Sequence, residues 1–190
     1  MRGIFKEFQK IGKLMQDFGL ITSHAGNLSI RKDHFIFITR HGSMLSELTS
    51  SDIIKVPLEK KRKGASFELP VHQQIYANTS ANAIMHAHPV HAIILSWFED
   101  MIKPMDSEGK IILKDIPVLK CKITIGSAEV SSVLCKAFAR YKIAVVREHG
   151  SFAIGNDLEE TLCYTSALEA SSKMIIYREI LLRIKNIMKK

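Results

Sequence analysis

Two histidines separated by a single residue, His86 and His88, give the clearest chemical signal in the sequence. They end an apolar segment, residues 83–88, and Pro89 follows, so we predict a buried strand that stops here. Residues i and i+2 of a strand point to the same face, with Cα atoms about 6.5 Å apart. Two imidazoles at that spacing can reach one metal ion; the alternative is a pair of polar surface or structural histidines.

A third histidine, His149, follows the apolar segment 143–146 and precedes Gly150. We expect it at a strand end beside a tight turn. Three histidines with an open fourth position are the usual ligands of a catalytic zinc, which can polarise a carbonyl and stabilise an enolate. The spacing alone leaves two interpretations open, a ligand that meets the other two histidines or a turn residue bonded to the backbone.

An acid, Glu68, lies at the start of a predicted helix, four residues before His72 and on the same helical face. Taken alone, Glu68 fits an acid that matches the dipole of the first helical turn. We expect His72 to be a core or supporting histidine rather than a metal ligand. His91, three residues after His88, is open to either interpretation.

Two glycine-containing turns border predicted strands and could cradle an anion with their backbone amides. One is Gly26-Asn27, and the other is Arg40-His41-Gly42. The 27 Lys and Arg residues exceed the 19 Asp and Glu residues by 8, and this positive charge suits an anionic metabolite or nucleic acid. Because no nucleic-acid recognition motif is present, we expect a small-molecule partner and no nucleic acid.

Periodicity predicts helices and strands in mixed order. Helices are expected at residues 4–18, 70–78, 91–98 and 128–141, and a last one starts at Asp157 and could break near Tyr177. A short strand is expected after the Gly26 turn, and others at 35–39, 53–57, 83–88, 143–146 and 152–154. Residues 117–124 read as a strand pair and residues 104–115 as a loop. The mixture predicts an α/β sandwich of layers around one sheet.

The composition is that of a folded globular protein with a full core, because 46% of the 190 residues are hydrophobic and 24% are charged. We therefore expect a single domain over residues 1–190. The apolar runs are too short to cross a bilayer, and the N-terminus lacks a secretory signal, so we expect no membrane partner. Three cysteines without a CxxC motif indicate reduced thiols in the cytoplasm.

Six motifs occur in the order found in one known family. They are Gly26-Asn-Leu-Ser-Ile-Arg, Ile38-Thr-Arg-His-Gly, Ser66-Phe-Glu, His86-Ala-His-Pro, Gly126-Ser-Ala-Glu and Glu148-His-Gly. With this order the chain, from about residue 4 to residue 177, resembles the class II aldolase/adducin family, and in particular its small L-fuculose-phosphate aldolase-like members. The resemblance implies a three-layer α/β/α sandwich with a central, mostly antiparallel sheet. It also implies a cyclic homotetramer with active sites at the subunit interfaces.

The resemblance further assigns roles to individual residues. It implies one zinc ion per chain on His86, His88 and His149, with Glu68 beside it as general acid or base. The substrate phosphate would lie on a set of turn residues: Gly26, Asn27, His41, Gly42 and Ser66. The implied reaction cleaves a small phosphorylated ketose, similar to fuculose 1-phosphate, into dihydroxyacetone phosphate and an aldehyde through a metal-bound enediolate.

Departures from the family pattern concern the substrate pocket. His41 and Phe67 stand where hydroxyl residues are usual, although Arg40 or His41 could restore charge. The tyrosines that serve the family as acids have no counterpart, which leaves the acid for the aldehyde product unassigned. The alternatives are an epimerase, a dehydratase or a decarboxylase of the same family, or a non-catalytic scaffold similar to the adducin head. The intact set of three histidines and Glu68 argues against the scaffold.

Overall fold

The centre of the fold is an eight-stranded sheet, seen in a computed structural model that describes residues 2–189. The strands are β1 (Asn27–Lys32), β2 (Phe35–Thr39), β3 (Ile53–Pro57), β4 (Ala83–Ala87), β5 (Met101–Ile102), β6 (Ile116–Leu119), β7 (Ile143–Val146) and β8 (Gly150–Gly155). Their order in the sheet is β3-β2-β1-β4-β8-β7-β6-β5. Of these neighbours, β6 and β7 run parallel and the others antiparallel. The sheet is mostly antiparallel, as predicted.

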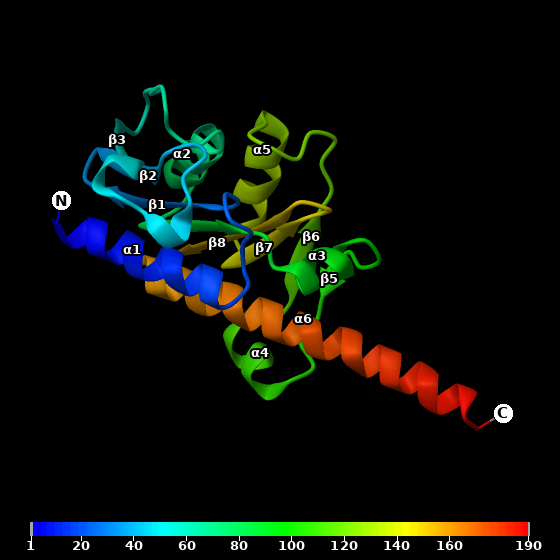
Figure 1. Cartoon of the computed structure of the whole chain (residues 1–190). Coiled ribbons are helices and arrows are strands. Elements are labelled where there is room, and N and C mark those ends of the chain that lie inside the picture. The colour runs from blue at the N-terminus through cyan, green and yellow to red at the C-terminus, as the bar shows by residue number, and fades with distance from the viewer. Residues whose placement is uncertain (1, 190) are drawn as a thin grey trace.

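Helices cover both faces of the sheet (Figure 1). They are α1 (Arg2–Asp17), α2 (Leu69–Asn78), α3 (Val90–Ser96), α4 (Ser107–Ile112), α5 (Ala128–Ala137) and α6 (Leu158–Ile187). Apolar side chains of α2 and α5 pack on one face, whereas those of α1, α3 and α6 pack on the other. Two short 3-10 turns, η1 (Leu45–Glu47) and η2 (Ser50–Asp52), lie between β2 and β3. This architecture is the expected three-layer α/β/α sandwich.

Strand β4 is central and is buried along its whole length. Ile84 packs in the core formed with α2 and α5, whereas Met85 and Ala87 pack in the core formed with α1 and α6. Because side chains alternate along a strand, His86 shares the side of Ile84. The strand ends at Ala87, so His86 and His88 lie at its end, as the sequence predicts.

The prediction of a loop over residues 104–115 is wrong, because these residues contain α4. The helix has six residues, too few to show a helical period in the sequence. It begins after Asp106, whose side chain accepts a hydrogen bond from the Gly109 amide at 2.7 Å. The same carboxyl group accepts a second hydrogen bond from Ser171 Oγ of α6 at 2.6 Å, which fastens α4 to that helix.

Residues 117–124 were expected to form a strand pair, but they contribute only to β6, and this prediction is also wrong. The neighbours of β6 come from other parts of the chain. The two-residue strand β5 pairs with it on one side and β7 pairs with it on the other. Alternation within residues 117–124 could not reveal partners that are so distant in sequence.

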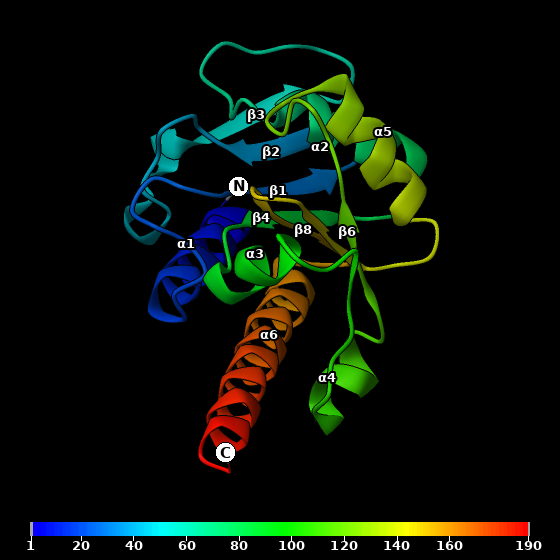
Figure 2. The same ribbon diagram turned by 90° about the vertical axis from the view of Figure 1, so that its right-hand side faces the viewer.

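Helix α6 continues without a break through Tyr177 and runs past the edge of the other layers (Figure 2). The suggested break near Tyr177 is therefore absent. Among residues 2–189, no helix combines the length and the hydropathy that crossing a bilayer requires.

The contact between α1 and the turn at Leu45 generates a first prediction. A Cβ atom at Gly12 would lie 2.1 Å from the carbonyl oxygen of Leu45, so Gly12→Ala should lower the free energy of unfolding by about 1–3 kcal/mol. Alanine is the better helix former by about 1 kcal/mol, so helix propensity alone predicts the opposite sign. Gly3→Ala, at an exposed position of the same helix with nothing within 4 Å of the added carbon, is the matched control. Equal urea midpoints for the two variants would contradict the prediction.

Candidate metal centre

Three histidines from separate segments meet at the end of β4. His86 belongs to β4, His88 follows it directly, and His149 lies in the turn between β7 and β8. Antiparallel pairing of β4 with β8 sets Ala87 opposite Ser151, which brings this turn beside the end of β4. One ring nitrogen from each histidine lies within 4.8 Å of the others. Of the two interpretations that the sequence left open for His149, the structure supports the one in which it meets the other two histidines.

The orientation of the rings leaves nitrogen lone pairs for a shared ligand. Nδ1 of His86 lies 3.0 Å from the carbonyl oxygen of Ser151, so this nitrogen donates and Nε2 carries the lone pair. Nε2 of His88 lies 3.0 Å from Nε2 of His86, and Nδ1 of His149 is buried without a hydrogen-bond partner. Converging imidazole nitrogens fit a divalent metal ion, and the backbone carbonyl at Ser151 supplies the usual support for a ligand histidine.

The turn that carries His149 depends on its neighbours. A Cβ atom at Gly150 would lie 2.4 Å from the Ala87 carbonyl oxygen and 2.8 Å from the ring of His88, so only glycine allows this approach. Glu148 has φ 63°, in the left-handed region, and its amide donates to Ser96 Oγ at 3.1 Å. A glycine and a hydrogen bond from the Glu148 amide to α3 therefore hold the third histidine in place.

The environment keeps the three imidazoles neutral. Burial lowers the pKa of His86 well below its usual range, and the neighbouring His88 and His149 lower it further. Burial also lowers the pKa of His88, and it lowers that of His149 to about 4, although a backbone hydrogen bond with Thr124 opposes the shift. Phe152 stacks on His86 with ring centroids 4.2 Å apart and adds to the burial. Neutral imidazoles are the form that binds a metal.

Glu68 is a buried carboxyl group at the N-terminus of α2, with an exposed fraction of 3%. Burial raises its pKa to about 7, against the opposing hydrogen bond that Oε1 accepts from the Gly126 amide at 3.1 Å. Oε2 is buried without a partner. Gly126 is two residues from Thr124, whose backbone is hydrogen-bonded to His149, so the Cα atoms of Thr124 and Gly126 are about 7 Å apart at most. The short segment 124–126 therefore links the Glu68 carboxyl group to the histidine cluster.

His72 is a core histidine, as expected from the sequence. It is fully buried, and its Nδ1 lies 2.6 Å from Ser29 Oγ, which in turn lies 2.8 Å from the hydroxyl group of Tyr76. Burial lowers its pKa to about 3, so it stays neutral. The ring supports α2 against β1 and is not a member of the metal cluster.

Gly26 and Asn27 lie directly beside the cluster, because Asn27 is opposite His86 in the pairing of β1 with β4. Gly26 has φ 79°, and a Cβ atom there would lie 2.8 Å from the carbonyl oxygen of His86. Oδ1 of Asn27 is buried without a partner. A close backbone turn and an unpaired amide oxygen thus border the site.

The other predicted anion contacts come together at the end of β2. The Ser66 amide donates to the Thr39 carbonyl oxygen at 3.1 Å, so the 66–68 segment lies beside the 40–42 turn, and Ser66 Oγ accepts from the Glu68 amide at 3.2 Å. The rings of His41 and Phe67 are in contact, with centroids 3.8 Å apart. The two positions that depart from the family pattern therefore touch one another.

Arg40 is less suited to the anion than the sequence suggested. Its Nε atom donates to Asp52 Oδ1 at 2.9 Å, and its Nη2 atom also bonds to that oxygen. Ser43 Oγ donates to the same oxygen at 3.0 Å. The guanidinium group is therefore committed to an ion pair, and His41 is the remaining candidate to restore positive charge.

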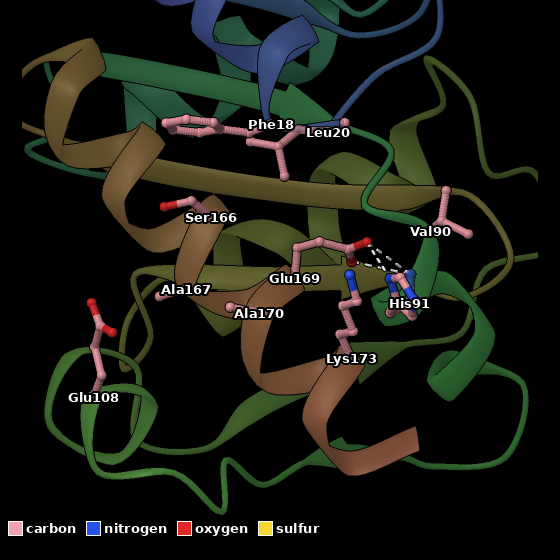
Figure 3. Close-up of a pocket in the computed structure, with 11 residues that line it drawn as sticks. Phe18, Leu20, Val90, His91, Glu108, Ser166, Ala167, Glu169, Ala170 and Lys173 are labelled. Atoms are coloured by element: carbon pink, nitrogen blue, oxygen red, sulfur yellow. Dashed lines mark hydrogen bonds and ion pairs between the residues drawn. The ribbon is translucent and has the colours of Figure 1, made fainter. Parts of the chain in front are cut away.

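The groove in Figure 3, of about 600 Å³, is not lined by the three histidines, although Leu20 on its wall accepts a hydrogen bond from the His88 amide at 2.8 Å. It is formed by the end of α1 and by α3, α4 and α6, on the opposite side of the sheet from α2 and α5. His91 lies here, with Nδ1 2.6 Å from Glu169 Oε1, so this histidine pairs with a carboxylate and does not join the cluster.

The raised pKa of Glu68 generates a second prediction. The folded chain keeps a proton on this carboxyl group up to about pH 7, whereas the ordinary value is 4.5, so the folded state binds more protons between these limits. In chelator-treated protein, the free energy of unfolding should therefore fall as pH rises from 4.5 to 7, by at most about 3 kcal/mol from this group. Glu68→Gln removes the effect, and denaturation at several pH values measures the difference. Parallel profiles for wild type and variant would contradict the assigned pKa.

Comparison with known proteins identifies the family of the chain. The family model for the class II aldolase and adducin N-terminal domain matches residues 6–176. L-fuculose phosphate aldolase of Methanococcus vannielii is 29% identical over 172 residues, which are 89% of this chain and 93% of that protein. Methylthioribulose-1-phosphate dehydratase of Acidiphilium cryptum is 32% identical, over 86% of this chain and 85% of that protein.

Among solved structures, L-fuculose-1-phosphate aldolase from Thermus thermophilus superposes with a TM-score of 0.93 at 32% identity, covering 96% of this chain and 97% of that one. The fold and the match of the family model over most of the chain agree. The protein therefore belongs to the class II aldolase and adducin family.

Proposed function

We propose that the protein is a metal-dependent aldolase that cleaves a small phosphorylated ketose into dihydroxyacetone phosphate and an aldehyde. The observation that carries the proposal is the convergence of three neutral histidines beside a buried acid whose pKa is near 7. The similarity to L-fuculose phosphate aldolases over most of the chain supports it.

His86, His88 and His149 are the residues that would hold the metal, for which we propose zinc, one ion per chain. When bound, such an ion acts as a Lewis acid that stabilises negative charge on a carbonyl oxygen. The histidines themselves contribute because they are neutral, because their ring nitrogens converge and because neighbouring backbone groups hold them in place. Ser151 fixes the tautomer of His86, and Gly150 allows the close approach of His88.

Glu68 is proposed as the residue that moves a proton. A group with a pKa near the working pH can both hold and release a proton, which general acid–base catalysis requires. In the direction of cleavage, its unpartnered Oε2 would deliver a proton to the carbon that keeps the electron pair of the broken C–C bond. The Gly126 amide orients the carboxyl group through Oε1.

The substrate phosphate is proposed to bind at the two turns and the 66–68 segment. Backbone amides of the Gly26 and Gly42 turns, the side chain of Asn27 and the hydroxyl group of Ser66 supply neutral donors, and His41 supplies a further donor. The protein would work as a homotetramer, as the family resemblance implies, and in the cytoplasm, as its three cysteines without a CxxC motif indicate.

A second candidate function is dehydration of a phosphorylated ketose at the same site. It is favoured by the 32% identity to a methylthioribulose-1-phosphate dehydratase and by Phe67, whose side chain is 66% exposed beside Glu68. An apolar group at this place suits a substrate with an apolar substituent. Epimerase and decarboxylase activities use the same metal chemistry, and a 3-oxo-tetronate 4-phosphate decarboxylase of Pectobacterium atrosepticum is 29% identical over 89% of this chain and 82% of that protein.

The proposed function generates a third prediction. Zinc-loaded wild type, incubated with a panel of phosphorylated ketoses, should release dihydroxyacetone phosphate from at least one of them, measured with a coupled reductase. Glu68→Gln should lower turnover by about 10²-fold or more, the usual contribution of a general acid or base. Glu59→Gln, an exposed acid in the loop before α2, is the control and should be unchanged.

Two other outcomes would redirect the assignment. Loss of water from a ketose phosphate, without release of dihydroxyacetone phosphate, would favour the dehydratase. Full activity in Glu68→Gln would move the proton-transfer role to another residue.

The phosphate contacts generate a fourth prediction. Asn27→Ala and His41→Ala should each weaken binding of dihydroxyacetone phosphate, by about 1 kcal/mol or roughly fivefold, because each removes one hydrogen-bond partner. Calorimetric titration measures the effect. His34→Ala, in the exposed turn at the far end of β1, is the matched control. If neither variant differs from the control, the two turns do not form the phosphate site.

A further inference from the structure

Helix α3 is attached to the segments of two histidines of the cluster. It begins at Val90, two residues after His88, and ends at Ser96. The Glu148 amide donates to Ser96 Oγ at 3.1 Å, so the turn that carries His149 is fastened to the end of this helix. A helix of seven residues is only about 10 Å long. Its position therefore affects both the segment of His88 and the turn of His149.

The apolar contacts of α3 are few. Of its seven residues, only Ala92, Leu95 and Ser96 are buried, and Val90 is 52% exposed. A helix this short is unstable alone, because it forms few internal hydrogen bonds for the conformational freedom that it loses. Polar contacts at its two ends therefore contribute much of what holds it in place.

A carboxylate of α6 holds the start of α3. The His91 amide donates to both oxygens of Glu169, at 3.0 and 3.2 Å, and the Ala92 amide donates to Oε2 at 3.3 Å. The His91 ring closes the contact, with Nδ1 2.6 Å from Oε1 (Figure 3). The residue before the helix, Pro89, provides no side-chain hydrogen bond. Because the first amides of a helix lack partners within it, Glu169 takes the place of the missing cap.

An arginine two residues before His149 holds the other end of α3. Nη1 of Arg147 donates to the Trp97 carbonyl oxygen at 3.1 Å, and Nη2 donates to the Glu99 carbonyl oxygen at 3.0 Å. Nη2 also donates to the Asp100 carboxylate at 2.5 Å. Carbonyl groups at a helix end lack partners within the helix, and the planar fork of a guanidinium group can reach several of them at once.

We propose that Arg147 and Glu169 are positioning residues for the metal centre and act through α3. Neither belongs to the histidine cluster, so each acts through the backbone that it holds. The side chains of a binding site must be held within about 0.5 Å of the productive geometry, and a shift of α3 moves the segments of two ligands. The inference rests on the metal binding of the proposed function, but it is independent of the reaction and the substrate.

Zinc affinity tests the proposal without any substrate. Arg147→Ala and Glu169→Ala should each raise the dissociation constant for zinc by about tenfold or more, because residues that support metal ligands typically contribute 10- to 100-fold. Competition with a chromophoric chelator measures this constant. Arg140→Ala and Glu179→Ala, at exposed positions in other parts of the chain, are the matched controls and should keep the wild-type constant.

The direction of the effect at Arg147 separates positioning from simple electrostatics. Removing a positive charge near a bound cation should strengthen zinc binding if only charge matters, whereas loss of positioning should weaken it. Tighter zinc binding by Arg147→Ala would therefore overturn the proposal.

The melting temperature of chelator-treated protein separates positioning from a merely structural role. A lower melting temperature with unchanged zinc affinity in both variants would overturn the proposal and leave the metal site intact. A wild type that binds no zinc would overturn the metal site itself. If an alanine variant does not fold, Arg147→Gln and Glu169→Gln, which keep part of the hydrogen bonds, take its place. Each should raise the constant by less than alanine would, about threefold, and wild-type constants in both would again overturn the proposal.

A double-substitution cycle tests the route from Arg147 to the metal. If the arginine acts mainly through the turn that carries His149, Arg147→Ala should change the zinc affinity of a His149→Ala protein by less than twofold. Substitutions that share a route to the metal are not additive, whereas independent ones are. An effect of full size in the His149→Ala background would overturn this route.

Discussion

The pairing of β4 with β8 is the constraint on which the rest of the site depends. Its register places His86 opposite Phe152 and Ala87 opposite Ser151. The β7–β8 turn therefore reaches the end of β4, and His149 enters the cluster from a position more than 60 residues away in the chain. A slip of one residue would turn His86 to the other face of the sheet and separate it from its partners.

The same burial that shapes the site leaves polar groups without partners, which lowers stability. Oε2 of Glu68, Oδ1 of Asn27 and Nδ1 of His149 are all buried and unpaired. Each such group is unfavourable in a protein core by about 1–3 kcal/mol. Their grouping at one end of the sheet is therefore expected where a ligand completes the hydrogen bonds or the coordination, and stability there is given up for binding.

The sequence predicted much of this arrangement and missed other parts for definite reasons. The same-face pair His86 and His88 followed from the two-residue period of a strand. The meeting with His149 did not follow from local spacing, because strand pairing is a long-range property, and only the family resemblance implied it. The ion pair that occupies Arg40 depended on Asp52, which lies in a 3-10 turn. Helix α4 was too short to show a helical period in the sequence. Ser96 and Phe152, which support the cluster, carried no local signal at all.

The central claim is that three histidines of one chain hold a single metal ion. X-ray absorption spectroscopy at the zinc edge, on protein purified without chelator and loaded with one equivalent of zinc, tests it directly. The structure predicts a first shell of nitrogen and oxygen ligands at about 2.0–2.1 Å, with scattering from three imidazole rings in wild type and from two in His149→Ala. Sulfur ligands at about 2.3 Å, or the same number of imidazoles in both proteins, would contradict the assignment.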